Sequence, residues 1–225
     1  MNFRTPLAWV PTLYFSKGLS HVILMTVAVV VYIQLGLSDT EVAFYTAWLA
    51  LPWVLKPLLI QFTRLYQTKR WWILTMQLLM GSALAGVAFT IRGSQWLQST
   101  LFFLMLFAFS SATQDSVLDF YYKRRLDAYD RSRLAGIRYI FYHLSYILGK
   151  GMLVPVAGIL QVIYRNQKIY TWSLVFYALA GIFMAIWLYH FAVLPRSVAV
   201  GEMRNFSFRA ILGNVYSMFR AFFSK

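Results

Sequence analysis

The segment Phe107-Ala-Phe-Ser-Ser-Ala-Thr-Gln-Asp-Ser-Val-Leu-Asp-Phe-Tyr-Tyr-Lys-Arg-Arg125 ends a long apolar run and finishes in three basic residues. In a helix, residues four positions apart share one face, so Ser111, Asp115 and Asp119 would form a polar stripe. A helix that is otherwise apolar enough for a membrane must turn such a stripe away from lipid. The segment therefore predicts a membrane helix whose polar face meets something other than lipid.

The composition excludes a soluble protein. Of the 225 residues, 60% are hydrophobic and 12% are charged, whereas soluble domains carry about a quarter charged residues. We therefore predict an integral membrane protein in contact with the lipid bilayer. The chain has no cysteine, which excludes disulfides, thiolate metal sites and cysteine nucleophiles. We expect no metal and no cofactor.

The formal net charge of +14 does not indicate a nucleic-acid partner. Proteins that bind nucleic acids gather basic residues on one solvated face, but here these residues occupy the gaps between apolar runs. We also expect no cleaved signal peptide. The first apolar stretch, residues 7–36, is longer than the roughly 7–15 residues of a signal-peptide core.

Six apolar runs are long enough to cross a membrane, since a spanning helix needs about 20 mostly apolar residues. Lipid offers the backbone no hydrogen-bond partner, so each run should be helical. The sequence therefore predicts an all-α integral membrane fold, with a six-transmembrane-helix bundle over residues 1–195. The runs cover roughly residues 7–35, 42–63, 71–91, 96–122, 134–163 and 170–194.

The basic residues predict the orientation of this bundle. Most of them lie at the N-terminus, in the second and fourth loops and after the sixth run. Because basic loops stay in the cytoplasm, we expect both termini there and the protein in the inner (cytoplasmic) membrane. Residues 196–225 form a separate unit, in which apolar residues recur at helical spacing among basic ones. This pattern is typical of an amphipathic linker at the membrane surface.

Ionisable residues inside the expected spans are candidates for function, because charges within a membrane are costly and usually face a bundle interior or a wet cavity. A rise of ~1.5 Å per residue puts Lys17 and His143 near the middle of the bilayer. Asp119 and Arg138 both fall about one turn inside the cytoplasmic face, and we predict that they form a structural ion pair. The full set is Lys17, His21, Lys56, Asp115, Asp119, Arg138, His143 and Lys150.

Two interpretations stay open for most of these residues. Asp115 is either a carboxylate that couples protons or contacts substrate, or a hydrogen-bonding partner of a neighbouring helix. Lys17 and Lys150 either form a cationic wall for a carboxylate- or phosphate-bearing solute, or extend their ammonium groups to the membrane surface. His21 and His143 either carry protons or join helices by hydrogen bonds.

Small residues and prolines predict how the helices pack and bend. Glycine and alanine allow helices in membranes to approach closely, and kinks are expected at Pro57 and Pro155. Lys56, beside Pro57, is interpreted as reaching the lipid headgroups. The small residues expected at packing positions are Gly81, Ala85 and Ala88 in the third run and Gly149, Gly151, Ala157 and Gly158 in the fifth.

The arrangement of short-looped spans resembles the N-terminal half of a major facilitator superfamily transporter. Within that superfamily, several segments look like the muropeptide permease (AmpG) branch. They are Gly36-Leu-Ser-Asp-Thr-Glu-Val-Ala-Phe-Tyr45, Leu51-Pro-Trp-Val-Leu-Lys-Pro57, Thr68-Lys-Arg-Trp-Trp-Ile73 and Ser110-Ser-Ala-Thr-Gln-Asp115. The resemblance covers almost the whole chain.

This resemblance implies proton-coupled import of muropeptide or another anionic solute, along a path between two six-helix halves. The chain corresponds to one half, so a second six-helix half or a homodimer is the expected partner. In the superfamily, the loop between spans two and three acts as a gate and carries an aspartate. Here the matching position is Arg64, followed by Lys69 and Arg70, and this charge reversal is consistent with a chain that lacks its other half.

Three functional hypotheses follow. The first is a truncated or half-size secondary transporter with a cavity lined by spans one, four and five. The second is a non-transporting, degenerate six-helix protein that acts as a scaffold or partner subunit. The third, an intramembrane enzyme, is the weakest, because the carboxylates and histidines match no hydrolase or metal motif.

Overall fold

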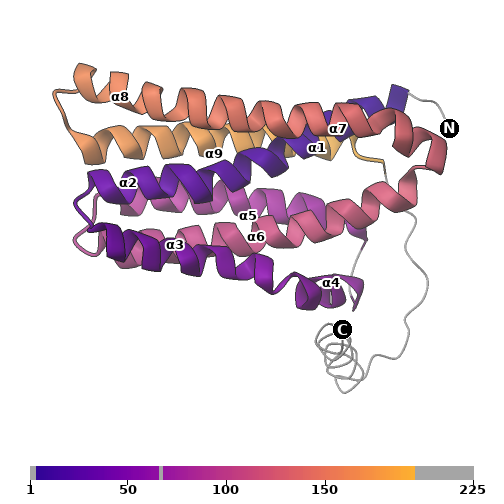
Figure 1. Cartoon of the computed structure of the whole chain (residues 1–225), viewed down its shortest axis with the longest axis horizontal. Coiled ribbons are helices and arrows are strands. Elements are labelled where there is room, and N and C mark those ends of the chain that lie inside the picture. The colour runs from indigo at the N-terminus through magenta and orange to yellow at the C-terminus, as the bar shows by residue number, and fades with distance from the viewer. Residues whose placement is uncertain (1–3, 66–67, 196–225) are drawn as a thin grey trace.

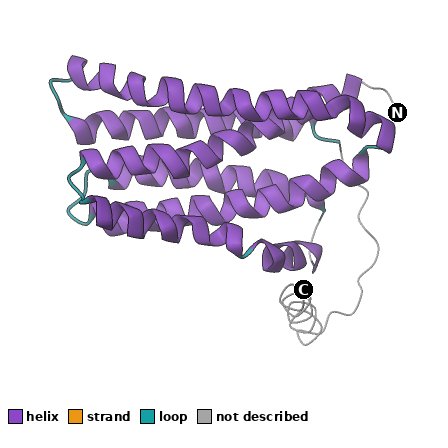
Figure 2. Ribbon diagram, viewed as in Figure 1, coloured by secondary structure: helices purple, strands orange, loops and turns teal. Residues whose placement is uncertain are grey.

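The computed structural model describes residues 4–65 and 68–195 of the chain, and the side chains at 4, 5, 64 and 65 are not part of this description. All elements within these ranges are helices, and no strand occurs there (Figure 2). The predicted all-α class is therefore confirmed for this part of the chain. The amphipathic linker expected at residues 196–225 lies outside the described residues.

The helices run back and forth along one long axis (Figure 1). Two of the long helical segments contain a short π-helical stretch, η1 in the first and η2 in the fifth. In chain order the elements are α1 Arg4–Val22, η1 Ile23–Val27, α2 Ala28–Gln34, α3 Asp39–Val54, α4 Lys56–Leu65, α5 Lys69–Thr90, α6 Trp96–Arg125, α7 Ala128–Leu148, η2 Gly149–Leu153, α8 Val154–Ile163 and α9 Lys168–Val193.

Several of these helices are long and apolar enough to cross a membrane. Five qualify directly, and a sixth is counted if α3 and α4, which meet at a bend of 44°, form one span. The bend falls between Val54 and Lys56, so the kink expected at Pro57 is present. The segment that contains Pro155, Ala128–Ile163, is counted as one span with no comparable bend. Pro155 follows shortly after the π-helical segment η2.

Local side-chain chemistry explains where several helices begin. Ser38 and Glu41 form a capping box at the start of α3, in which each side chain bonds the backbone N–H of the other residue. The Thr68 hydroxyl accepts from the N–H of Trp71 at 3.2 Å, and the Asp127 carboxylate accepts from the N–H of Asp130 at 2.7 Å. These caps satisfy N–H groups that a helix leaves free in its first turn.

Apolar side chains form two buried clusters, and a polar segment separates them. In α6, Leu104, Phe107 and Ala108 belong to the larger cluster, whereas Val117 and Leu118 belong to the smaller one. Between them runs Ser110–Ser116, which is buried throughout and carries Asp115. The fold thus holds a run of polar side chains inside the bundle.

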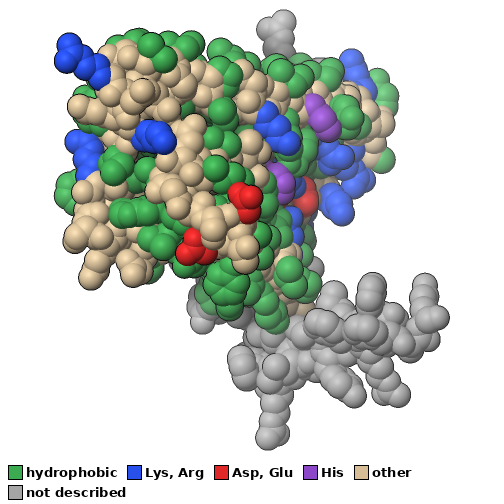
Figure 3. Space-filling model, turned by 60° about the vertical axis from the view of Figure 1, so that its left-hand side comes forward, with side chains coloured by type: hydrophobic (Ala, Val, Ile, Leu, Met, Phe, Trp, Pro, Cys, Tyr) green, Lys and Arg blue, Asp and Glu red, His purple; other side chains and the backbone are tan. Residues whose placement is uncertain are grey.

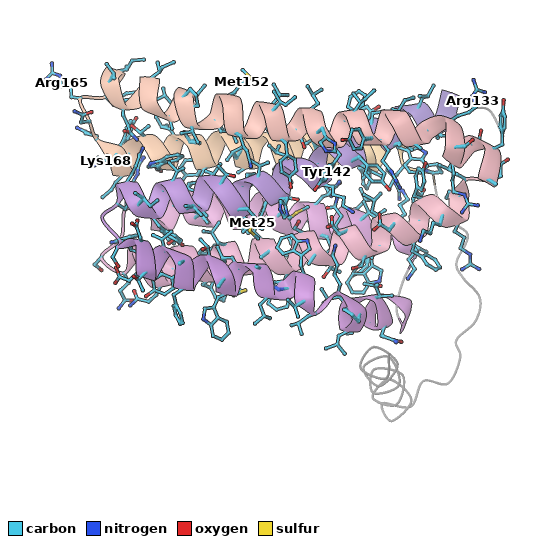
Figure 4. The ribbon with its side chains drawn as sticks, viewed as in Figure 1. Met25, Arg133, Tyr142, Met152, Arg165 and Lys168 are labelled. Carbon is cyan, nitrogen blue, oxygen red and sulfur yellow. The ribbon has the colours of Figure 1, made fainter. Side chains whose placement is uncertain are left out.

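The first and fifth helical segments cross at glycines. A Cβ added at Gly18 of α1 would lie 2.6 Å from the carbonyl oxygen of Tyr142 in α7, and one added at Gly149 would lie 2.6 Å from Val22 Cγ1. Tyr142 is labelled in Figure 4, at this crossing of α7 with α1. No residue larger than glycine fits either position without moving a neighbour.

The packing expected of the other small residues holds only in part. Ala88 and Ala157 are buried, and Gly81 lies close to the side chain of Met184. Gly151 and Gly158 are exposed, and a Cβ at either would meet nothing within 4 Å. The expectation for these two glycines was wrong, because only one narrow side of this segment faces the bundle.

A third histidine, His190 of α9, joins three helices by hydrogen bonds. Its side chain is fully buried, with Nε2 2.8 Å from the Thr12 hydroxyl and Nδ1 2.9 Å from the Gln77 amide nitrogen. We expect His190→Leu to lower the free energy of unfolding by about 2 kcal/mol, because the fully buried amide of Gln77 loses this partner and Thr12 keeps only the carbonyl of Trp9.

Unfolding in mixed detergent micelles, followed by circular dichroism, would measure this loss. The matched control is His143→Leu, since the exposed His143 bonds only the carbonyl of Tyr139 within its own helix. Equal effects of the two substitutions would contradict a structural role specific to His190.

Candidate functional site

The candidate site is centred on the carboxylate of Asp115 in α6. Lys56 Nζ of α4 lies 3.1 Å from its Oδ2, Trp53 Nε1 of α3 donates to the same oxygen at 3.3 Å, and Lys17 Nζ of α1 lies 3.8 Å away. The Asp115 side chain is 8% exposed, against 17% for Lys17 and 31% for Lys56. Two ammonium groups from different helices therefore converge on one nearly buried carboxylate.

The second carboxylate, Asp119, lies one turn further along α6 and is 48% exposed. Lys17 Nζ lies 3.5 Å from its Oδ1, and the Tyr14 hydroxyl donates to the same oxygen at 3.5 Å. Lys17 thus bridges the two carboxylates. The Ser20 and Ser111 hydroxyls lie 2.8 Å apart, so all three residues of the stripe Ser111–Asp115–Asp119 contact α1, in agreement with the predicted polar face turned away from lipid.

The predicted ion pair between Asp119 and Arg138 is wrong. No nitrogen of Arg138 lies within 4.0 Å of a carboxylate in the described part of the chain, and Asp119 pairs with Lys17 instead. The Arg138 guanidinium lies over the rings of Tyr14 and Tyr122, 5.3 Å from each centroid. Matching depth was not enough, since the guanidinium packs on these two rings and Lys17 is the cation that reaches Asp119.

His21 and two aromatic side chains lie beside Asp115. The His21 ring is stacked on Tyr146 of α7, with ring centroids 5.7 Å apart. It also forms a T-shaped contact with Trp53 at the same centroid distance. The charges of Asp115, Lys17, Lys56 and Lys150 all act on this ring. Lys150 Nζ lies 5.6 Å from the centroid of Tyr146. His21 and Lys150 therefore border the site, whereas neither contacts a carboxylate directly.

His143 lies apart from the carboxylates. Its ring packs against Tyr139 and Tyr142 of the same helix and its Nδ1 is 2.9 Å from the Tyr139 carbonyl oxygen. Its hydrogen bond stays within α7, so it does not join two helices by this contact.

The basic residues that begin α5 are tied to α4 and to the end of α9. Arg70 donates to the carbonyl oxygens of Phe191 at 2.6 Å and Leu194 at 3.0 Å, and Lys69 donates to that of Thr63. The backbone at Arg64 belongs to α4, but its side chain is outside the described atoms. The proposed gating role of these residues stays a prediction.

Sequence reasoning missed Lys56 and Trp53 as members of the site. Lys56 was interpreted as reaching the headgroups, but the bend between α3 and α4 falls directly before it and its ammonium group meets Asp115. A signal was available in the sequence. Lys56 and Asp115 lie at comparable distances from the cytoplasmic ends expected for their spans, and a buried carboxylate needs a cation.

The site carries more positive than negative charge. In the described part of the chain, Lys17 and Lys56 pair with the two carboxylates, Asp115 and Asp119, and Arg138 and Lys150 add two further cations on the rings of neighbouring tyrosines. Figure 3 shows basic, acidic and histidine side chains gathered on one face among apolar ones. Beside the cluster, Ser16 Oγ and Gln114 Oε1 are buried and make no hydrogen bond within the described residues. The arrangement can bind an anion.

The described residues contain no group of three histidine or carboxylate side chains placed to hold a metal ion. No protein-family model, curated protein or solved structure matches this chain. The resemblance to a transporter superfamily therefore stays a prediction, and the charges and contacts of the site carry the functional argument.

Proposed function

We propose that the chain is one six-helix half of a proton-coupled secondary transporter for an anionic solute, of the major facilitator type and similar to the AmpG branch. The observation that carries the proposal is the convergence of Lys17 and Lys56, from separate helices, on Asp115. Ionisable groups inside a membrane bundle are costly and commonly mark solute and proton pathways.

The contacts of Asp115 suggest how proton and solute would be coupled. With Asp115 ionised, its charge offsets that of the two ammonium groups. Protonation of Asp115 would remove that negative charge and leave Lys56 free to bind an anion, whereas Lys17 would keep Asp119 as its partner. A proton and an anionic solute would then bind together, which is the requirement for symport, and muropeptide is one such solute.

Two π-helical segments lie at the crossing beside this site. η1 of the first segment and η2 of the fifth contact each other, next to Val22 and Gly149. Single π-helical turns are frequent at functional sites because they interrupt regular hydrogen bonding. In the proposed transporter, this crossing is where the first and fifth segments would adjust as access to the site changes.

The proposal includes a partner and an orientation. We place both termini in the cytoplasm, from the distribution of basic loops, and a second six-helix half, in a homodimer or a separate chain, against the charged face. The alternative is a non-transporting scaffold. It is favoured by one observation, that Asp115 and Asp119 already have lysine partners within the chain.

Uptake of labelled anhydro-muropeptide by a permease-deficient bacterial strain expressing the full chain tests the proposal. We expect uptake that a protonophore abolishes and that Asp115→Asn reduces at least about tenfold, the effect of losing roughly 1.4 kcal/mol of coupling. Asp39→Asn, at the exposed start of α3, is the matched control and should transport normally. No uptake despite membrane insertion would favour the scaffold.

A further inference from the structure

At the end of the bundle opposite to the α6–α7 loop, the described residues form an open hollow that carries two basic side chains. This hollow of about 550 Å³ lies where the end of α2, the loop after α5 and the start of α9 meet. Its lining includes the two cations Arg92 and Lys168, the amide side chains of Gln34, Asn166 and Gln167, and the ring of Tyr170. No acidic side chain is among these residues, and the hollow shares no residue with the Asp115 site.

The two cations of the hollow are held in place without a carboxylate. Neither Arg92 nor Lys168 forms a salt bridge in the described ranges. The Arg92 guanidinium lies 4.9 Å from the centroid of Tyr170, which positions it at the rim by a cation–π contact. Both side chains are exposed and their charges remain available to a ligand.

The neutral polar groups add donors to this site. Gln34 Oε1 accepts hydrogen bonds from Gln161 Nε2 at 2.6 Å and from Trp172 Nε1 at 2.9 Å. These bonds fix the Gln34 side chain and leave its amide nitrogen as the group that can face a ligand. A hollow with a guanidinium, an ammonium and amide donors suits a phosphate group, which accepts several charge-assisted hydrogen bonds.

The position of the hollow suggests that the phosphate belongs to a lipid. The hollow lies at the end of one candidate membrane span, Pro6–Gln34, and at the start of another, Lys168–Val193. The ends of membrane spans lie at the depth of the lipid headgroups. Ile169, which lines the hollow, is an exposed apolar side chain that an acyl chain could cover.

We propose that this hollow binds a phosphate-bearing anion through Arg92 and Lys168. The phosphate belongs either to the headgroup of an anionic phospholipid or to a free phosphate compound. This proposal does not depend on transport, since a scaffold of the same fold would bind the anion equally well.

The test is binding of phosphatidylglycerol to the delipidated full chain in mild detergent, read by native mass spectrometry. We expect the double variant R92Q/K168Q to bind phosphatidylglycerol at least about tenfold more weakly, because two charge-assisted contacts are lost. Phosphatidylcholine, whose headgroup is neutral overall, should bind weakly to both proteins. Lys168→Gln alone should give a smaller loss.

Arg165→Gln is the matched control. Arg165 lies in the loop between α8 and α9, next to Asn166 of the hollow, but it does not line the hollow itself. Its side chain points away from the bundle (Figure 4). It should bind phosphatidylglycerol like the wild type. Displacement of the lipid by millimolar inorganic phosphate would identify a free phosphate site, and no displacement a headgroup site. Unchanged binding in R92Q/K168Q, or an equal loss in Arg165→Gln, would overturn the proposal.

Discussion

Asp115→Asn should lower the free energy of unfolding by about 3 kcal/mol, the loss typical of breaking a nearly buried ion pair by removing one partner. Lys56, 3.1 Å from the carboxylate, then has no anionic partner in the described structure, whereas Lys17 keeps Asp119. The effect should be large because the Asp115 side chain is only 8% exposed, so water has little access to take the place of the lost carboxylate beside Lys56.

The chain offers a matched control four residues away. Asp119→Asn removes a carboxylate of the same helix face, but its side chain is 48% exposed. Exposed ion pairs contribute up to about 1 kcal/mol, so this variant should unfold almost like the wild type. The measurement is unfolding in mixed detergent micelles, followed by circular dichroism at constant pH.

A double variant distinguishes two causes of the stability loss, the unpaired lysine and the missing carboxylate. Asp115→Asn combined with Lys56→Gln should recover part of the stability lost in Asp115→Asn alone, because no uncompensated ammonium group remains. If Asp119→Asn proves as damaging as Asp115→Asn, or if the double variant loses the sum of both single effects, the site is not organised around Asp115.

The second large effect is expected at the crossing of α1 and α7. Gly18→Ala should lower the free energy of unfolding by about 3 kcal/mol, at the upper end of the range for overpacked sites. A Cβ at this position would lie 1.9 Å from Ser145 Oγ and 2.6 Å from the carbonyl oxygen of Tyr142. The serine can rotate, but the carbonyl belongs to helix backbone, so the two helices must separate.

Two other glycines provide the control for the same substitution. Gly158 of α8 and Gly181 of α9 have nothing within 4 Å of an added Cβ. Alanine favours a helix by about 1 kcal/mol over glycine, so Gly158→Ala and Gly181→Ala should be neutral or stabilising. Micelle unfolding would show opposite signs at Gly18 and at these positions.

A further variant tests the physical cause. Adding Ser145→Ala to Gly18→Ala removes the clash with the hydroxyl but not the one with Tyr142, so only part of the loss should be recovered. Full recovery would show that the side chain alone limits the crossing. A harmless Gly18→Ala would contradict the close approach of α1 and α7.

Much of the architecture was predictable from local sequence pattern. Long apolar runs predicted helices of membrane-spanning length, and the spacing of Ser111, Asp115 and Asp119 predicted a polar face turned inward. Both properties depend on residues near each other in the chain, and the structure bears them out. Lys17 was predicted as part of a cationic wall near the middle of the bilayer, and its contacts with Asp115 and Asp119 were not predicted.

The partners of these residues were not predictable in the same way. Asp119 pairs with Lys17 rather than Arg138 because Tyr14 and Tyr122 take up the Arg138 guanidinium. Depth along the bundle axis can be counted in residues, but the rotation of each helix about its own axis cannot. Two residues at equal depth meet only if both helices turn the right faces toward each other.

The sequence by itself determined the helical, membrane-compatible fold and the inward polar stripe, since hydrophobicity and a period of four residues act locally. Only the tertiary structure decided which cations meet Asp115 and which glycines must be glycine. Lys56 reaches the carboxylate from directly after a bend, and Gly18 and Gly149 lie at a crossing whereas Gly151 and Gly158 do not. These outcomes depend on how separate helices rotate and bend against one another, which no single segment specifies.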